Sequence, residues 1–179
     1  MLLFWEHGYE ATSLNDLTSA LGVPPSSIYA AFGDKKGLFF DAVGLYLSGP
    51  VTFEAMLDQA PTAHAAAQAM LTGSAIGFTG ESTPAGCLLA SAALSCSDNA
   101  ADVRQTLAAI RHGMEAQLRT RIVKGIAMEE LPVDTDADAL AGLTMAVIQG
   151  MSTLARDGAP REKLLRVAAA ALRAWPPAR

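Results

Sequence analysis

Helix-start and helix-stop residues divide this chain at short intervals, and the apolar residues between them recur at helical spacing. Ser13 can cap a short helix that Gly22 ends, and Leu14, Leu17 and Leu21 then share one face. Alanine is abundant and β-branched residues are scarce, which favours helix throughout. We therefore predict an all-α fold, with short helices on either side of residues 22–24, a longer helix after Asp34, and further helices at about 62–79, 86–97, 102–129, 136–157 and 160–174.

The composition excludes several classes of protein. Hydrophobic residues make up 51% of the chain and charged residues 17%, which excludes a disordered protein. The net charge of −5 argues against indiscriminate binding to nucleic acid and leaves specific binding open. Residues 59–97 are almost uncharged, but prolines and glycines interrupt them too often for a membrane-spanning helix. Two cysteines cannot build a disulfide framework, so we expect a cytoplasmic protein without a membrane partner.

Residues 12–32 have the outline of a helix-turn-helix, with two short helices joined by Gly22-Val23-Pro24. In that motif the second helix enters the major groove of DNA. The outline by itself has low specificity, because short amphipathic helix pairs occur in many helical proteins. The surrounding residues carry the more specific signal.

The run from Gly8 to Phe39 closely resembles the N-terminal DNA-binding domain of the TetR family of bacterial transcriptional repressors. The resemblance implies a three-helix DNA-binding domain at residues 1–47 and a helical ligand-binding and dimerisation domain at residues 48–179. Family members have a longer first helix than the segment before Gly8 allows, so a shortened first helix and a loosened domain are expected. The matching positions are Phe4, Gly8-Tyr9, Thr12-Ser13, Leu17, Leu21-Gly22-Val23, Ile28-Tyr29, Phe32, Lys35 and Leu38-Phe39.

The resemblance also implies which residues contact DNA. Tyr29 and Lys35 match phosphate contacts of the family, and Lys35 and Lys36 lie at a helix start, where free N–H groups attract phosphate. Thr12 and Ser13 are expected to donate to a phosphate, with simple helix capping as the alternative. The residues expected to read bases are Asn15 on the first helix and Pro25, Ser26, Ser27, Tyr29 and Ala30 on the second.

A small, largely apolar effector is predicted to bind among the almost uncharged residues 59–97 and the helix that faces them. Methionine suits such a site because its side chain adapts to irregular apolar guests. Most of the candidates are expected to be ordinary core residues, with only some touching the ligand. They are Phe53, Met56, Met70, Phe78, Leu88, Leu89, Ile110, Met114 and Leu118, with Gln149 as a polar group that orients the guest.

The last two helices, 136–157 and 160–174, are expected to pair with their symmetry mates as a four-helix bundle. Gly142, Ala146 and Gly150 lie four residues apart, which would let two backbones approach closely. The alternative is that this row packs only inside the monomer. The predicted interface residues are Leu143, Ala146, Val147, Gly150, Met151, Leu154, Leu164, Val167 and Ala171.

No residue pattern indicates catalysis, a metal or a cofactor. The three histidines are far apart, and Cys87 and Cys96 have a spacing unlike that of zinc pairs. We therefore expect a homodimeric repressor that a small apolar molecule releases from a palindromic operator. The alternative is a dimer that binds small molecules or proteins and has lost operator binding through its shortened first helix.

Overall fold

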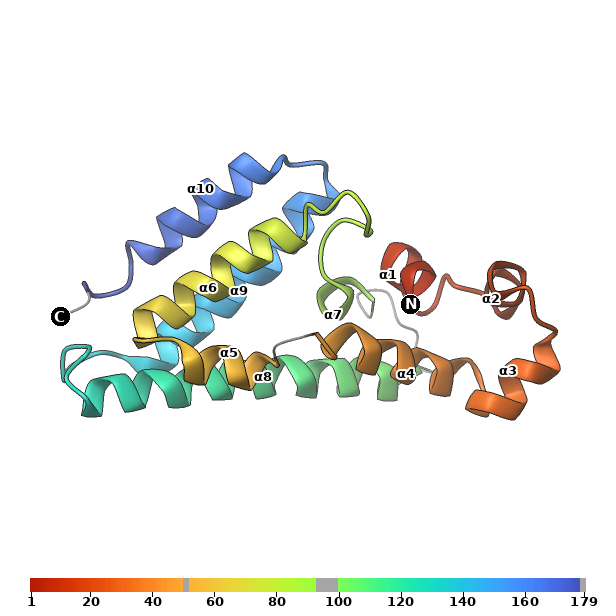
Figure 1. The fold of residues 1–179 in the computed structure, drawn as a ribbon, viewed down its shortest axis with the longest axis horizontal. Helices are drawn as coiled ribbons and strands as arrows, with labels where there is room; N and C mark the ends of the chain where they lie inside the picture. Colours follow the sequence, from red (N-terminus) through yellow and green to blue (C-terminus); the bar gives the residue numbers. More distant parts are fainter. Residues whose placement is uncertain (50–51, 93–99, 178–179) are drawn as a thin grey trace. The chain divides into compact units, whose positions relative to one another are not determined.

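The computed structural model describes residues 1–49, 52–92 and 100–177, and every regular element among them is a helix (Figure 1). This confirms the predicted all-α fold. The chain forms two compact units, one of Met1–Pro50 with Cys87–Ala109 and the other of Val51–Gly86 with Ile110–Arg179. The first unit thus includes a segment from the middle of the chain, besides the residues 1–47 expected from the sequence.

Aromatic side chains form the centre of the first unit. The Phe39 ring meets the Phe4 ring edge to face at 5.1 Å between centroids and the Tyr9 ring at 5.0 Å. Phe4 and Phe39 are fully buried, so the short first helix is anchored despite its length. The helices of this unit are α1 (Leu2–His7), α2 (Leu14–Leu21), α3 (Pro25–Phe32), α4 (Lys35–Leu47), α7 (Leu88–Ser91) and the first residues of α8 (Ala101–Ala127).

One predicted helix is shorter than expected, and one observed helix was not predicted. The helix expected at 86–97 is observed as the single turn α7, and its residues 93–97 lie outside the described residues. A separate helix, α5 (Phe53–Gln59), was not predicted. Thr52 starts it by accepting a hydrogen bond at Oγ1 from the Ala55 N–H at 3.1 Å, so the signal was a threonine cap.

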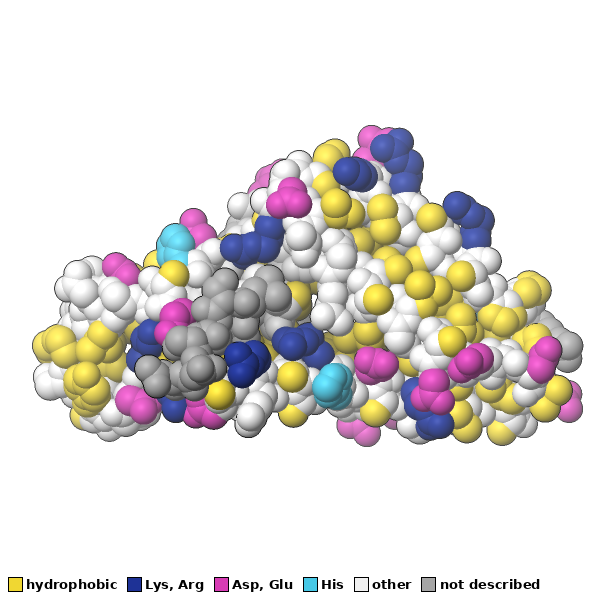
Figure 2. All heavy atoms as spheres, turned by 180° about the vertical axis from the view of Figure 1, so that it is seen from behind, with side chains coloured by type: hydrophobic (Ala, Val, Ile, Leu, Met, Phe, Trp, Pro, Cys, Tyr) yellow, Lys and Arg dark blue, Asp and Glu magenta, His cyan; other side chains and the backbone are white. Residues whose placement is uncertain are grey.

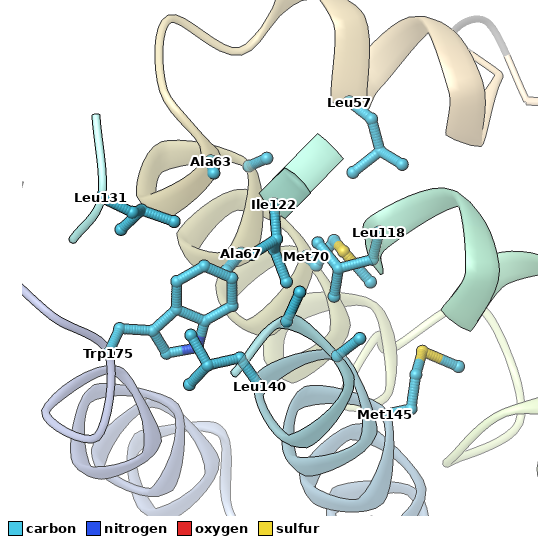
Figure 3. Packing of buried hydrophobic residues seen from close by; sticks show 13 residues of the cluster. Leu57, Ala63, Ala67, Met70, Leu118, Ile122, Leu131, Leu140, Met145 and Trp175 are labelled. Atoms are coloured by element: carbon cyan, nitrogen blue, oxygen red, sulfur yellow. The ribbon is translucent and has the colours of Figure 1, made fainter. Parts of the chain in front are cut away.

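In the second unit, α6 (Ala63–Gly77), α9 (Ala137–Arg156) and α10 (Arg161–Leu172) pack against one another (Figure 1). Four alanines of α6 are fully buried, and their small side chains let the neighbouring helices approach α6 closely. They are Ala63, Ala66, Ala67 and Ala75. Figure 3 shows the Trp175 indole lying beside Ala67, Ile122 and Leu140 in this core. Among the described residues, no helix combines the length and the apolar character needed to cross a membrane.

A buried ion pair joins three segments of the second unit. The two terminal nitrogens of Arg121 donate to the two carboxylate oxygens of Glu130, each at 3.1 Å. Glu130 also accepts from the Ala63 N–H at the start of α6, at 2.7 Å. Burial opposes ionisation of Glu130, but the hydrogen bonds from Arg121 and Ala63 outweigh it and hold its pKa below the ordinary value. No local sequence pattern marks this pair.

Candidate DNA-binding site

The second helix of the helix-turn-helix, α3, presents one face to solvent, and this face carries the hydroxyl groups of Ser26, Ser27 and Tyr29. Ile28 is 1% exposed and fixes the opposite face of α3 to the unit. Tyr29 is 52% exposed. Asn15 on α2 is exposed as well. All five residues predicted to read bases from α3 are exposed, namely Pro25, Ser26, Ser27, Tyr29 and Ala30.

The local sequence explains where α2 begins and ends and where α3 begins. Ser13 and Asp16 form a capping box, in which the Asp16 N–H donates to Ser13 Oγ at 3.1 Å and the Ser13 N–H to Asp16 Oδ2 at 2.9 Å. The hydrogen bond from the Ser13 hydroxyl lowers the pKa of Asp16. Gly22 then ends α2 with a φ of 66°, a conformation that favours glycine. Pro25 fits the first turn of α3, where no N–H donor is required.

Thr12 does not belong to the DNA-contacting surface that the sequence predicted. Its side chain is fully buried, and its hydroxyl donates to the Gly8 carbonyl at 2.7 Å and the Leu3 carbonyl at 3.3 Å. A residue without exposed atoms cannot reach a phosphate, so this part of the prediction is corrected. Ser13, in contrast, is exposed, and its hydroxyl serves the helix cap.

Lys35 is engaged within the first unit. Its ammonium donates to the carbonyls of Tyr9 and Thr12, both at 3.1 Å, and lies 4.4 Å from the centre of the Tyr9 ring. Burial raises the pKa of Tyr9. Lys35 therefore links the start of α4 to the segment before α2. The ammonium has one further N–H, and its contact with a DNA phosphate stays a prediction.

A surface depression of about 400 Å³ lies beside α3, which we call the recognition helix. Lys36 lines it, and the ammonium of this lysine forms an ion pair with Asp102 at the start of α8. Asp34 starts α4 by accepting a hydrogen bond from the Gly37 N–H at 2.8 Å. The depression thus combines hydroxyl and ammonium donors that suit a phosphate. Its lining residues are Tyr9, Leu14, Tyr29, Asp34, Lys35 and Lys36.

Gly37 sets the approach of α3 to α4, a role that the sequence analysis missed. A Cβ atom at this position would lie 2.0 Å from the Phe32 carbonyl oxygen, which belongs to the backbone. The Gly37→Ala change should therefore displace the end of α3 and destabilise the protein by about 1–3 kcal/mol. Chemical denaturation and DNA affinity both report the change.

Gly44 provides the matched control on the same helix, because a Cβ there would meet nothing within 4 Å. Gly44→Ala should stabilise the protein by up to about 1 kcal/mol through helix propensity. Equal effects of the two substitutions would contradict the role assigned to Gly37.

The predicted effector-binding residues are divided between the two units. Met70 and Leu118 are buried in the core of the second unit, and Phe53, Met56 and Met114 pack against it. Leu88 and Leu89 belong to the first unit. Phe78 is buried outside this cluster, Ile110 is half-buried and Gln149 is exposed. Five of the ten candidates therefore share one apolar cluster, and binding of a ligand to them stays a prediction.

Of the nine residues of the predicted dimer interface, three are exposed, four are half-buried and two are fully buried. Leu143 is 38% exposed, and a Cβ added at Gly150 would meet nothing within 4 Å. Figure 2 shows hydrophobic side chains gathered over the C-terminal helices. Met151 and Leu164 correct the prediction, because both are fully buried inside their own unit and cannot face a partner. The accessible candidates are Leu143, Ala146, Val147, Gly150, Leu154, Val167 and Ala171.

Comparisons with known proteins agree with this arrangement. Residues 1–42 match the family described as bacterial regulatory proteins, tetR family, and residues 68–171 match the tetracyclin repressor-like C-terminal domain. The transcriptional repressor ComR of Escherichia coli is 38% identical over 98% of this chain and 85% of its own length. The repressor BdcR of Escherichia coli is 28% identical over 95% of this chain and 82% of its own length.

A solved structure extends the similarity to three dimensions. A cysteine-substituted form of the TetR family regulator CifR, complexed with 26-base-pair operator DNA, has a TM-score of 0.92 and 41% identity over 98% of this chain and 92% of that chain. These matches, together with the exposed face of α3, identify a DNA-binding transcriptional regulator. The chain belongs to the TetR family of bacterial regulatory proteins.

Proposed function

We propose that the protein is a dimeric cytoplasmic repressor that binds a palindromic operator through α3. The observation that carries the proposal is the exposed face of α3, with the hydroxyls of Ser26, Ser27 and Tyr29, held in place by buried Ile28. In a dimer, two such helices would enter successive major grooves on one side of the DNA. ComR and BdcR are repressors, and the CifR structure contains operator DNA, which supports the same role here. The proposal assigns no catalytic step.

We further propose that a small, largely apolar molecule releases the repressor. The apolar cluster of the second unit, with Met56, Met70 and Met114, is the site that its chemistry favours. Such a molecule must bind the DNA-free conformation more tightly than the DNA-bound one, because only a difference in affinity shifts the equilibrium.

Fluorescence anisotropy with short duplexes tiled across the DNA upstream of the protein's own gene tests the proposal. One duplex should bind at least about a thousandfold more tightly than its shuffled sequence at physiological salt. Uniform weak binding to every duplex would contradict operator recognition.

Asn15 offers a test of base reading from α2. An asparagine can make paired hydrogen bonds to adenine, worth about 1–3 kcal/mol, so Asn15→Ala should weaken operator binding about tenfold or more. The shuffled duplex serves as the control, because loss of a base contact should leave its affinity unchanged. An equal loss on both duplexes would show that Asn15 contacts the DNA backbone instead.

A further inference from the structure

The recognition surface of the first unit has few positive charges. Residues 14–32, which contain α2 and α3, include no lysine or arginine. Lys35 and Lys36 follow directly, and the Lys35 ammonium is already bonded to two carbonyls. The charge of Lys36 and the partner of its ammonium therefore influence DNA affinity more here than they would on a surface rich in cations.

Lys36 has a partner from a distant part of the sequence. Its ammonium is paired with Oδ2 of Asp102, the second residue of α8, and both belong to the first unit. The Lys36 side chain is 34% exposed and the Asp102 side chain 51%, so solvent and a ligand can reach both. The other carboxylate oxygen of Asp102 accepts from the Val103 N–H at 2.9 Å, which holds the carboxylate at the helix start.

The hydrogen bond between them lowers the pKa of Asp102 and raises that of Lys36, so both groups carry full charge at neutral pH. Lys36 also lines the depression that Tyr29 borders, beside the recognition helix. A phosphate placed there would compete with the Asp102 carboxylate for the same ammonium.

We propose that Asp102 is a positioning residue of the DNA-binding surface. It holds the Lys36 ammonium in the free protein and releases this ammonium to a DNA phosphate on binding. This inference rests on the proposed function. When the phosphate takes the ammonium, Asp102 loses its partner and its charge repels the DNA backbone. Asp102 therefore lowers DNA affinity in a manner that does not depend on base sequence.

The test compares Asp102→Asn with wild type by fluorescence anisotropy over a range of salt concentrations, on an operator duplex and on its shuffled sequence. Asp102→Asn should raise affinity about two- to fivefold for each protomer on both duplexes, the range expected for one exposed ion pair. The slope of log affinity against log salt should steepen by up to about one unit for each protomer, because Lys36 then neutralises a phosphate without releasing a carboxylate.

Asp41→Asn is the matched control, because Asp41 is exposed on α4, does not line the depression, and its replacement removes the same charge. It should change affinity and slope less than Asp102→Asn. In a Lys36→Met background, Asp102→Asn should do no more than Asp41→Asn. Thermal melting of each variant checks that the fold is retained.

Two results would overturn the inference while leaving the proposed function intact. One is an equal effect of Asp102→Asn and Asp41→Asn, and the other is an unchanged effect of Asp102→Asn when Lys36 is absent. If the wild-type protein binds neither duplex at low salt, the proposed function is itself wrong, and the inference is overturned with it.

Discussion

Glu130→Ala should lower the free energy of unfolding by about 3–5 kcal/mol, because it leaves the buried Arg121 guanidinium without a counter-charge. Arg121 is 6% exposed, so water cannot replace the lost carboxylate. The substitution also removes the acceptor of the Ala63 N–H at the start of α6. Urea denaturation followed by circular dichroism measures the change.

The pair between Arg166 and Glu162 on α10 supplies the control, since the two side chains are 72% and 81% exposed. Glu162→Ala should change stability by no more than about 0.5 kcal/mol. If Glu130→Ala and Glu162→Ala had similar effects, the buried pair would not stabilise the second unit.

The pair between Arg121 and Glu130 also predicts how the stability of the protein depends on pH. The pKa of Glu130 is lower in the folded protein than its ordinary value, so its contribution is complete above that ordinary value. Stability should then fall as the pH decreases through the folded pKa, in the acid range. Glu130→Ala should show a smaller decline over that range, and an identical decline would contradict the assignment.

Gly150→Arg should convert the dimer to monomers at micromolar concentration. Gly150 is exposed on α9 beside Leu143, Ala146 and Val147, where an arginine would place a charge against the apolar face of the partner. Losing the second half-site contact should also weaken operator binding about a hundredfold or more. Sedimentation equilibrium and anisotropy measure the two effects.

Gly73→Arg is the matched control, because Gly73 is an exposed glycine of α6 with nothing within 4 Å of an added Cβ. It should leave both the dimer and operator affinity unchanged. A stable dimer of the Gly150→Arg variant would place the interface elsewhere on the molecule.

The sequence predicted the helix-turn-helix well because its signals are local. The capping box at Ser13, the left-handed Gly22 and the proline at the start of α3 each act within one helical turn. The family resemblance marked Tyr29 as a DNA contact, and Tyr29 is exposed on α3 while its neighbour Ile28 is buried. Such features follow from residues that are neighbours along the chain.

The sequence could not predict features that depend on contacts between distant segments. Helical periodicity placed Met151 and Gly150 in one apolar stripe of α9. It could not show that Met151 packs inside the unit while Gly150 stays exposed. Burial of Thr12 depends on how α1 folds back over it. The pairing of Lys36 with Asp102 joins residues 66 positions apart, and no local pattern marks it.

Hydroxyl-radical footprinting on the upstream duplex that binds most tightly tests whether two copies of α3 read a palindrome. We expect two protected regions on one face of the DNA, with centres about 10 base pairs or one helical turn apart. A single protected region, or uniform protection along the duplex, would contradict it.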